Sequence, residues 1–397
     1  MTGRGQLERR LRDAHWLASA DVQAVFALLD GEARRTRAVG GIVRDTLLGI
    51  VRPEAEVDFA SELRPEEVMA RAAENKVAAY PTGIAHGTVT LRVGMLVAEV
   101  TTLRQDVATD GRHAEVRFGT DWAADAARRD FTINAFYVDN TGTLFDPLNN
   151  IGDLLPPRIR FIGDPDRRIA EDRLRVFRFF RFSASHGGER FDAAGLEAVR
   201  RAAGTLDRLS AERIGSEMRR ILDLPRIATT LRAMRETGVL ALAPETIDRL
   251  QVYGGQTHRA NFGARLALLL ASEKQDFQAL WRLPNDVMSR ARAVLAAAGL
   301  LQDLRVHEAV YRFPGLLADA VDVASVLAGW TEAGKSAVLD QLQHVTPRAF
   351  PLSGTDLLAC GLKAGPSLGS ELARLEGLWI DSGFSLDRAA LLELVEK

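Results

Sequence analysis

The sequence predicts an α+β protein in which a small head with a mixed sheet precedes a longer, all-helical part. Two observations lead to this class. Short runs of β-branched and aliphatic residues, typical of strands, occur only between residues 37 and 145, where helical segments separate them. After Pro157 the apolar residues recur with helical periodicity to the end of the chain, and glycines and prolines separate the helices.

The expected elements follow one another in a simple order. Residues 2–30 predict one or two helices, and residues 64–75 predict a helix between strands. The expected strands are 37–39, 57–59, 87–93, 96–101 and 133–138. The expected helices after Pro157 are 164–185, 192–203, 211–222, 226–236 and several from 262 onward. At 397 residues the chain is too long for one compact domain, so we expect about two to four.

Composition places the chain among soluble globular proteins. Hydrophobic residues make up 47% and charged residues 26% of the sequence, and no run approaches the roughly 18 apolar residues of a membrane span. The N-terminus lacks the apolar core of a signal peptide. A single cysteine, Cys360, excludes an intramolecular disulfide, and no Cys/His cluster could bind zinc. We therefore expect a cytoplasmic protein without membrane association. Because the net charge is −2, any surface for nucleic acid must be a local basic patch.

The first candidate ligand-binding segment is VGGIVRDTLLG at 39–49. It follows a short apolar run and begins an amphipathic helix. Gly40 and Gly41 would let the backbone approach a ligand closely, and the N–H groups of the helix N-terminus would attract phosphate. Arg44, one turn into the helix, could reach the same anion. The alternative is an ordinary tight turn between a strand and a helix.

Three carboxylates suggest a site for divalent metal. Glu56 and Asp58 lie two residues apart in an extended segment, so their side chains project from the same face. Such a pair can share two cations, as two-metal phosphoryl transfer requires, and oxygen-only ligands favour Mg²⁺ or Mn²⁺ over zinc. Glu99 lies in an apolar run typical of a central strand, where an acid costs free energy unless it is paired or metal-bound. The alternative for the pair alone is two solvated charges at a strand end.

Polar residues also interrupt the apolar segment RRDFTINA at 128–135. Its two guanidinium groups, Arg129 among them, could bind a triphosphate, and Asp130 and Asn134 could contact ribose hydroxyls. A salt-bridged helix end is the alternative.

Residues 171–181, EDRLRVFRFFR, predict a helix with one apolar face and regularly spaced arginines at 175, 178 and 181. Asp172 and Arg175 are three residues apart and would be neighbours on one helical face. An aspartate acceptor beside an arginine donor complements the amino group and ring nitrogen that cytosine and adenine both present, and repels uracil and guanine. The alternative is a surface ladder of ion pairs.

One further motif matches the sequence pattern of a phosphate-binding loop. Residues 329–336, GWTEAGKS, match the pattern GxxxxGK[ST]. That loop should follow a buried strand, whereas the run before residue 329 has helical periodicity. We therefore interpret the segment as a turn between helices.

In this order, the segments resemble the class II tRNA nucleotidyltransferases and their bacterial poly(A) polymerase relatives, over roughly residues 35–220. The matching motifs are VGGIVRDTLLG (39–49), EVDFAS (56–61), PTGIAHGTVTL (81–91), EVTTLR (99–104), DGRHAEV (110–116), DAARRDFTINA (125–135), FDPLNNIGDL (145–154), RIRFIGDPDRRIAEDRLRVFRFFRF (158–182) and SAERIGSEMRRIL (210–222). A looser match, SGTDLLACGLKAGPSLG at 353–369, resembles the tail of the family.

The resemblance implies that residues 1–150 form a nucleotidyltransferase head like that of DNA polymerase β. This range includes the N-terminal helices. The resemblance further implies a base-reading neck at 151–225, a helical body at 226–330 and a tRNA-binding tail at 331–397. The implied partners are tRNA, CTP and ATP, and the implied cofactor is a pair of Mg²⁺ ions, with Mn²⁺ as a substitute. No protein partner can be inferred.

The same resemblance implies roles for single residues. Glu56 and Asp58 would bind the metals, and Glu99 would be the third catalytic acid. The nucleotide would be bound by Gly40, Gly41, Arg44, Arg129, Asp130, Asn134, Asp172, Arg175, Arg178 and Arg181, and within this set Asp172 and Arg175 would read the base. The segment DGRHAEV would belong to the loop needed when specificity switches from C to A. One departure is Glu56, because the family usually has Asp at this position.

The expected reaction is in-line attack of the tRNA 3′-hydroxyl on the α-phosphate of CTP or ATP, with release of pyrophosphate. Three alternatives stay open: a bacterial poly(A) polymerase, an enzyme that adds only CC, and an inactive RNA-binding relative. The segment PTGIAHGTVTL lacks a longer basic leader, which disfavours the first. The intact DGRHAEV segment disfavours the second, while Glu56 keeps the third open.

Overall fold

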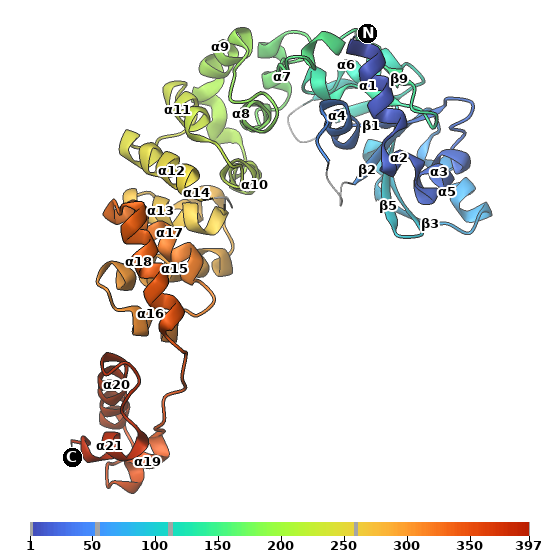
Figure 1. The fold of residues 1–397 in the computed structure, drawn as a ribbon. Helices are drawn as coiled ribbons and strands as arrows, with labels where there is room; N and C mark the ends of the chain where they lie inside the picture. The colour runs from blue at the N-terminus through green and yellow to red at the C-terminus, as the bar shows by residue number, and fades with distance from the viewer. Residues whose placement is uncertain (1–2, 52–55, 110–113, 258–260, 397) are drawn as a thin grey trace. The chain divides into compact units, whose positions relative to one another are not determined.

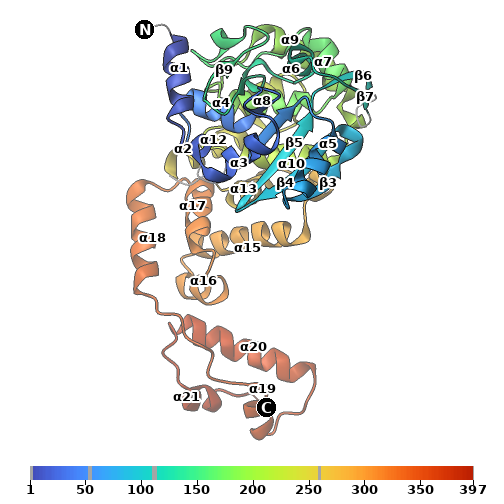
Figure 2. The same ribbon diagram turned by 90° about the vertical axis from the view of Figure 1, so that its right-hand side faces the viewer.

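The computed structural model describes residues 3–51, 56–109, 114–257 and 261–396, and their side chains except those at 105–116. The chain forms two compact units, residues 1–217 with 233–240 and residues 218–232 with 241–397. All the described strands lie in the first unit, and the described elements of the second are helices (Figures 1 and 2). The predicted α+β class is confirmed.

A seven-stranded mixed sheet forms the centre of the first unit, in the order β3-β4-β5-β2-β1-β8-β9. Strands β2 and β5 are parallel, and all other neighbours in this sheet are antiparallel. The strands are β1 (Thr36–Val39), β2 (Val57–Ser61), β3 (Ala78–Gly83), β4 (Thr88–Val93), β5 (Leu96–Thr102), β8 (Tyr137–Val138) and β9 (Leu144–Phe145). A separate hairpin pairs β6 (Arg104–Thr109) with β7 (Ala114–Phe118).

The helices of the first unit lie before, between and after the strands in the chain. They are α1 (Gly3–Arg12), α2 (His15–Ala18), α3 (Ala20–Leu28), α4 (Gly41–Leu48), α5 (Pro65–Glu74), α6 (Trp122–Ala127), α7 (Pro165–Glu171), α8 (Arg175–Ser185) and α9 (Ala193–Ala202). Helices α10 (Ala211–Leu222) and α11 (Ala228–Glu236) contain residues of both units. The N-terminal segment therefore holds three helices where one or two were expected.

Strands β4 and β5 have one buried and one open face. Val89, Leu91, Ala98 and Val100 are at most 1% exposed, and both α3 and α5 pack against β4. The alternate residues Val97 and Glu99 are exposed. This alternation is the period-two pattern of a sheet that is covered on one face only.

The predicted strand at 133–138 is wrong over its first half. Residues Thr132–Asn134 form a single 3-10 turn, and only Tyr137–Val138 joins the sheet. The Asp130 carboxylate accepts hydrogen bonds from the Phe131 N–H and the Asn134 side chain, at 2.9 and 3.0 Å. Side-chain bonds of this kind compete with strand pairing and hold a local turn.

The second unit is built from further helices. They are α12 (Pro244–Gln256), α13 (Phe262–Ser272), α14 (Phe277–Trp281), α15 (Asn285–Gln302), α16 (Val306–Arg312), α17 (Leu317–Ala328), α18 (Glu332–His344), α19 (Gly354–Ala359), α20 (Pro366–Asp381) and α21 (Arg388–Glu393). A C-terminal apolar cluster around Leu357, Leu375 and Trp379 joins α19 to α20. Among the helices that the structure describes, none combines the length and apolar character needed to cross a bilayer.

The segment at 329–336 contains the predicted turn between helices, at residues 329–331, and residues 332–336 already belong to α18. Gly329 ends α17 in the left-handed conformation, with φ of +66°, and the Thr331 side chain accepts a hydrogen bond from the Gly334 N–H at the start of α18. Lys335 forms an ion pair with Asp322 at 2.6 Å. A helix precedes the motif, so the strand that a phosphate-binding loop requires is absent from this described segment.

Arg265 on α13 is fully buried and holds the chain after α10. Its guanidinium donates to the backbone carbonyls of Leu222, Leu224 and Pro225. We expect Arg265→Leu to lower the free energy of unfolding by about 3 kcal/mol, because three acceptors lose their donor. Urea unfolding would measure this loss. Arg290→Leu is the control, since its ion pair with Asp319 is half exposed and contributes about 1 kcal/mol at most. Equal losses in the two variants would contradict the role given to Arg265.

Candidate active site

The central feature of the site is a pair of acids on adjacent parallel strands. Asp58 on β2 lies opposite Glu99 on β5 in the register of the sheet, and opposite Val39 on β1 on its other side. Because β1 ends at Val39, the chain turns at Gly40 directly beside Asp58. A Cβ at Gly40 would lie 3.3 Å from the Asp58 Oδ2, and the φ of Gly40 is +81°. Glycine is favoured here by the backbone conformation, and the N-terminus of α4 is thereby brought to the carboxylate.

The electrostatics at Asp58 suit a bound cation. The pKa of Asp58 is raised to about 6, first by burial and next by the charge of Glu99, while Arg129 lowers it and Glu56 adds a smaller increase. A divalent cation would remove this penalty by neutralising the crowded carboxylates. The donors are carboxylate oxygens, which fit Mg²⁺ or Mn²⁺.

The structure brings two of the three predicted acids together more clearly than the third. Glu56 is exposed and precedes β2, whereas Asp58 and Glu99 are register partners within the sheet. Among the described residues, no three His, Cys, Asp or Glu side chains are grouped closely enough to hold one metal ion. The carboxylate donors therefore fit a divalent metal, and Glu56 is not grouped closely with Asp58 and Glu99 in the structure.

Arg44 on α4 is buried and fixed by polar partners. Its Nη1 donates to the Asn134 Oδ1 at 2.8 Å, and its Nε donates to the Asp45 Oδ1 at 2.8 Å. The same oxygen of Asp45 lies 2.9 Å from the His186 Nε2. Two predicted nucleotide-binding residues, Arg44 and Asn134, are thus in direct contact although 90 positions separate them.

Arg129 lies close enough to Asp58 to lower the pKa of that acid. Its guanidinium donates to the Tyr137 hydroxyl at 3.2 Å and forms an ion pair with Asp125 at 3.3 Å. Tyr137 also donates to Asp125, at 2.8 Å. Sequence reasoning missed Asp125 and Tyr137. The helical spacing of Asp125 and Arg129 was the available signal for the first of them.

Asp130 is buried, and its carboxylate is occupied by protein donors. Besides its bonds to Phe131 and Asn134, it accepts from the Arg178 Nε at 2.7 Å. Arg181, one turn along α8, forms an ion pair with Glu217 at 2.6 Å. Arg178 also forms a longer ion pair with Glu217, at 3.9 Å. This pair joins Asp130, Asn134, Arg178 and Arg181 into one polar network, and Glu217 is a member that sequence reasoning missed.

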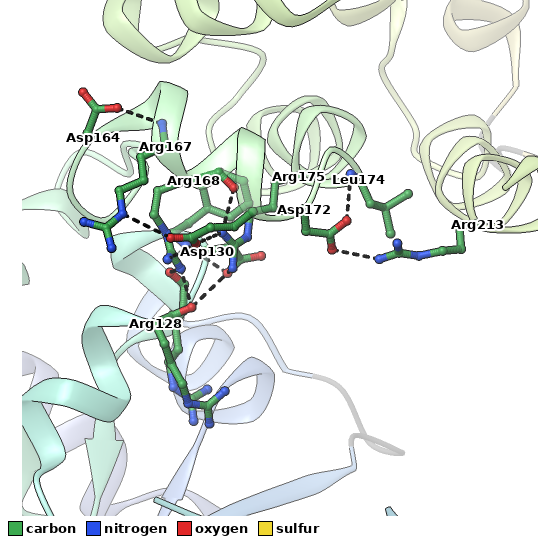
Figure 3. Close-up of polar contacts among 12 residues, drawn as sticks. Arg128, Asp130, Asp164, Arg167, Arg168, Asp172, Leu174, Arg175 and Arg213 are labelled. Atoms are coloured by element: carbon green, nitrogen blue, oxygen red, sulfur yellow. Dashed lines mark hydrogen bonds and ion pairs between the residues drawn. The ribbon is translucent and has the colours of Figure 1, made fainter. Parts of the chain in front are cut away.

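The predicted helical pair Asp172 and Arg175 is not formed (Figure 3). The helix expected at 164–185 is broken into α7 and α8, and Asp172 lies between them in an extended conformation. Its carboxylate accepts from the Leu174 N–H at 3.1 Å and from Arg213 at 2.8 Å. An aspartate that binds a backbone N–H two residues ahead starts a new helical turn instead of continuing the old one.

Arg175 has other partners. Its Nη1 donates to the Glu171 carboxylate at 2.8 Å and to the Arg168 carbonyl at 2.7 Å (Figure 3). Asp172 and Arg175 are therefore close in sequence but do not bond to each other. Asp172 binds Arg213, and Arg175 binds Glu171. The expectation that they share one face of a continuous helix is wrong, whereas their role in reading a base stays a prediction.

Comparison with known proteins agrees with this site. Residues 36–160 match the family model described as "Poly A polymerase head domain", and residues 190–249 match "Probable RNA and SrmB- binding site of polymerase A". Together with the paired acids and the glycine turn, this defines a nucleotidyltransferase of the polymerase type.

Curated relatives cover nearly the whole chain. The mouse protein "CCA tRNA nucleotidyltransferase 1, mitochondrial" is 31% identical over 96% of this chain and 91% of its own length. The "CCA-adding enzyme" of Limosilactobacillus fermentum is 30% identical over 89% of this chain and 91% of its own. A crystal structure of the Bacillus stearothermophilus CCA-adding enzyme in complex with CTP superposes with a TM-score of 0.76 at 26% identity, covering 92% of this chain and 94% of that one. The chain belongs to the family of CCA-adding tRNA nucleotidyltransferases.

Proposed function

We propose that this protein adds C, C and A to the 3′ end of tRNA, taking the nucleotides from CTP and ATP. The observation that carries the proposal is the Asp58–Glu99 pair beside the N-terminus of α4. The chain that holds this pair is 31% identical, over almost its full length, to the mouse CCA tRNA nucleotidyltransferase 1. The 3′-hydroxyl oxygen of tRNA would form a bond to the α-phosphorus. The bond to the β-phosphate would break, pyrophosphate would leave with the electron pair, and the hydroxyl proton would pass to solvent.

The residues of the site divide this work. Glu56 and Asp58 would hold two Mg²⁺ ions, or Mn²⁺ in their place, with Glu99 as the third catalytic acid, and the metals when bound stabilise negative charge on the reacting phosphate. Gly40 and Gly41 open the N-terminus of α4 to phosphate, and Arg44 and Arg129 add positive charge beside it. Asp130, Asn134, Arg178 and Arg181 would orient the sugar and base through the polar network, and Asp172 and Arg175 would select the base.

The predicted division into a head at 1–150, a neck at 151–225, a body at 226–330 and a tail at 331–397 belongs to this proposal. So do the cytoplasmic location and the role of the segment at 110–116. Residues 110–113 lie outside the described part of the chain, and the side chains of 114–116 do as well. The name of the mouse relative includes a mitochondrial location, so microscopy of a tagged protein is the direct test of compartment.

Labelled nucleotides, each supplied singly and CTP also together with ATP, test the activity. The protein is incubated with Mg²⁺ and tRNA that lacks its last three nucleotides. CTP alone should extend the tRNA by two residues, and CTP with ATP by three. Addition of A alone in long runs would indicate a poly(A) polymerase, and arrest after two C residues with ATP present would indicate a CC-adding enzyme. No addition by a folded protein that binds tRNA would indicate an inactive relative.

Salt dependence should reveal how the protein holds tRNA. If arginines bind the phosphates, the logarithm of the association constant should fall linearly with the logarithm of salt concentration, with a slope of about −3 or steeper. Fluorescence titration between about 50 and 300 mM KCl measures this slope. CTP binding serves as the internal comparison and should change less, because one ligand carries fewer phosphates. A flat response for tRNA would contradict binding through phosphates.

A further inference from the structure

The open face of the sheet continues outward from the active-site acids. In the register of the sheet, Asp58 lies opposite Glu99, Glu99 lies opposite Thr90, and Thr90 lies opposite Tyr80. Residues that are directly opposite on neighbouring strands project from the same face. These four side chains therefore form one row across β2, β5, β4 and β3. Tyr80, on the edge strand, lies about 14 Å from Asp58 by three strand spacings.

This face presents an exposed aromatic ring and several hydroxyls. Tyr80, on the edge strand β3, is 51% exposed. The Thr82 and Thr90 hydroxyls are 2.7 Å apart, and the Thr88 and Thr101 hydroxyls are 3.2 Å apart. Arg92, two residues along β4 from Thr90, is exposed. An aromatic ring, a group of hydroxyls and a guanidinium are the groups that bind bases, riboses and phosphates of single-stranded RNA.

The position of α4 determines from which side RNA must come. Strand β2 lies between β1 and β5, so the turn at Gly40 is on one side of Asp58 and Glu99 is on the other. If the triphosphate lies at the N-terminus of α4, pyrophosphate leaves on the β1 side. In-line displacement places the attacking hydroxyl opposite the leaving group, which is the β5 side. The nucleotides that precede this hydroxyl then extend over β5, β4 and β3.

We propose that Tyr80, Thr82, Thr90 and Arg92 form a docking face for the last unpaired nucleotides of the RNA substrate, with Tyr80 stacked on a base. The inference rests on the proposed function and extends it, because it assigns the path of the RNA end. Tyr80 is a positioning residue here, since it holds the RNA and does not touch the reacting atoms.

Binding measurements without nucleotide test the proposal. Two tRNAs are compared, one that ends in CC and one trimmed to its last paired region. We expect Tyr80→Ala to raise the Kd for the CC-ending tRNA about tenfold, the loss of one stacked base, and to leave the Kd for the trimmed tRNA within about twofold. In steady-state assays the same variant should raise KM for tRNA without changing KM for CTP.

Matched variants separate stacking from other effects. Tyr80→Phe keeps the ring and should bind like the wild type, and Met95→Ala, an exposed apolar residue in the β4–β5 turn, should also change nothing. Thr90→Val removes a hydroxyl at nearly constant shape and should weaken only the CC-ending tRNA. Equal affinity of Tyr80→Ala and wild type for the CC-ending tRNA would overturn the proposal, as would equal weakening of both tRNAs. These titrations need no turnover. An inactive wild type would therefore overturn the proposed function, whereas the Kd values of the two tRNAs would still test the docking face.

Discussion

Asp58→Asn should abolish nucleotide addition and should at the same time stabilise the metal-free protein at neutral pH. Activity should fall about a thousandfold or more, because a carboxylate that holds the cation contributes several kcal/mol to the transition state. Binding of tRNA should change little, since the proposed phosphate contacts lie elsewhere on the protein. Rates of CTP incorporation and tRNA titrations measure these two effects.

The gain in stability follows from the raised pKa of Asp58. Burial and then the charge of Glu99 lift this pKa from the ordinary 3.8 to about 6, so the folded protein binds the proton more tightly than the unfolded chain does. Above pH 6 the folded protein carries the ionised form at a cost of about 1–3 kcal/mol, and this cost disappears as the pH falls from 6 to about 4. Asn carries no charge and avoids the cost. Asp58→Asn should therefore exceed the wild type in stability at pH 8 without metal and match it near pH 4.

Two controls protect this interpretation. Glu66→Gln on the exposed surface of α5 makes the same change in net charge and should not alter stability by more than a few tenths of a kcal/mol. Mg²⁺ should stabilise the wild type and not Asp58→Asn, because only the former has the ligand. A fully active Asp58→Asn would remove the metal assignment, and a pH-independent difference in stability would remove the electrostatic explanation. Glu56→Asp should retain activity if Glu56 is a true ligand.

Local patterns were sufficient for the parts of the fold that depend on neighbours in the chain. The bounds of α10 match the prediction at 211–222, because its amphipathic repeat is regular. The glycine turn before α4 was also predictable, since a strand, two glycines and a helix follow one another directly. The hairpin of β6 and β7 and the edge strand β3 were not predicted. Strand β3, AAYPTG, contains a proline and has little apolar character, so its own sequence does not predict a strand. Its extended conformation is stabilised by the pairing with β4.

The roles of the candidate site residues stay predictions, and the contacts among them could not be predicted from the sequence. Arg44 and Asn134 could each be singled out from their motifs, yet their bond joins residues far apart in sequence. The break at Asp172 was hidden for a related reason. The apolar repeat continues through it, and only the bonds to the Leu174 N–H and to Arg213 fix the side chain away from the helical path. Pairs of this kind arise from packing, which no local period encodes.

Base selection should depend on Asp172 and Arg175. Asp172 would accept from the exocyclic amine of C or A, and Arg175 would donate to the adjacent ring nitrogen. Asp172→Ala should lower incorporation of CTP and ATP about tenfold or more, since each lost contact costs about 1–3 kcal/mol. Discrimination against UTP and GTP should fall further, because the acceptor that repels their carbonyl is gone. Relative incorporation of all four nucleotides measures both effects, and Arg175→Ala should behave in the same way.

The ion pair between Asp172 and Arg213 supplies the control that separates reading from stability. Arg213→Ala removes this pair, at 2.8 Å, but leaves the Asp172 acceptor in place. Asp172→Ala should lower the melting temperature more than Arg213→Ala does, because it also removes the bond to the Leu174 N–H. If the pair is only structural, base preference should be unchanged in both variants. If Asp172 reads the base, only Asp172→Ala should lose selectivity. Selectivity like that of the wild type in both Asp172→Ala and Arg175→Ala would exclude a protein template made by these side chains, because neither group would then distinguish an amine from a carbonyl.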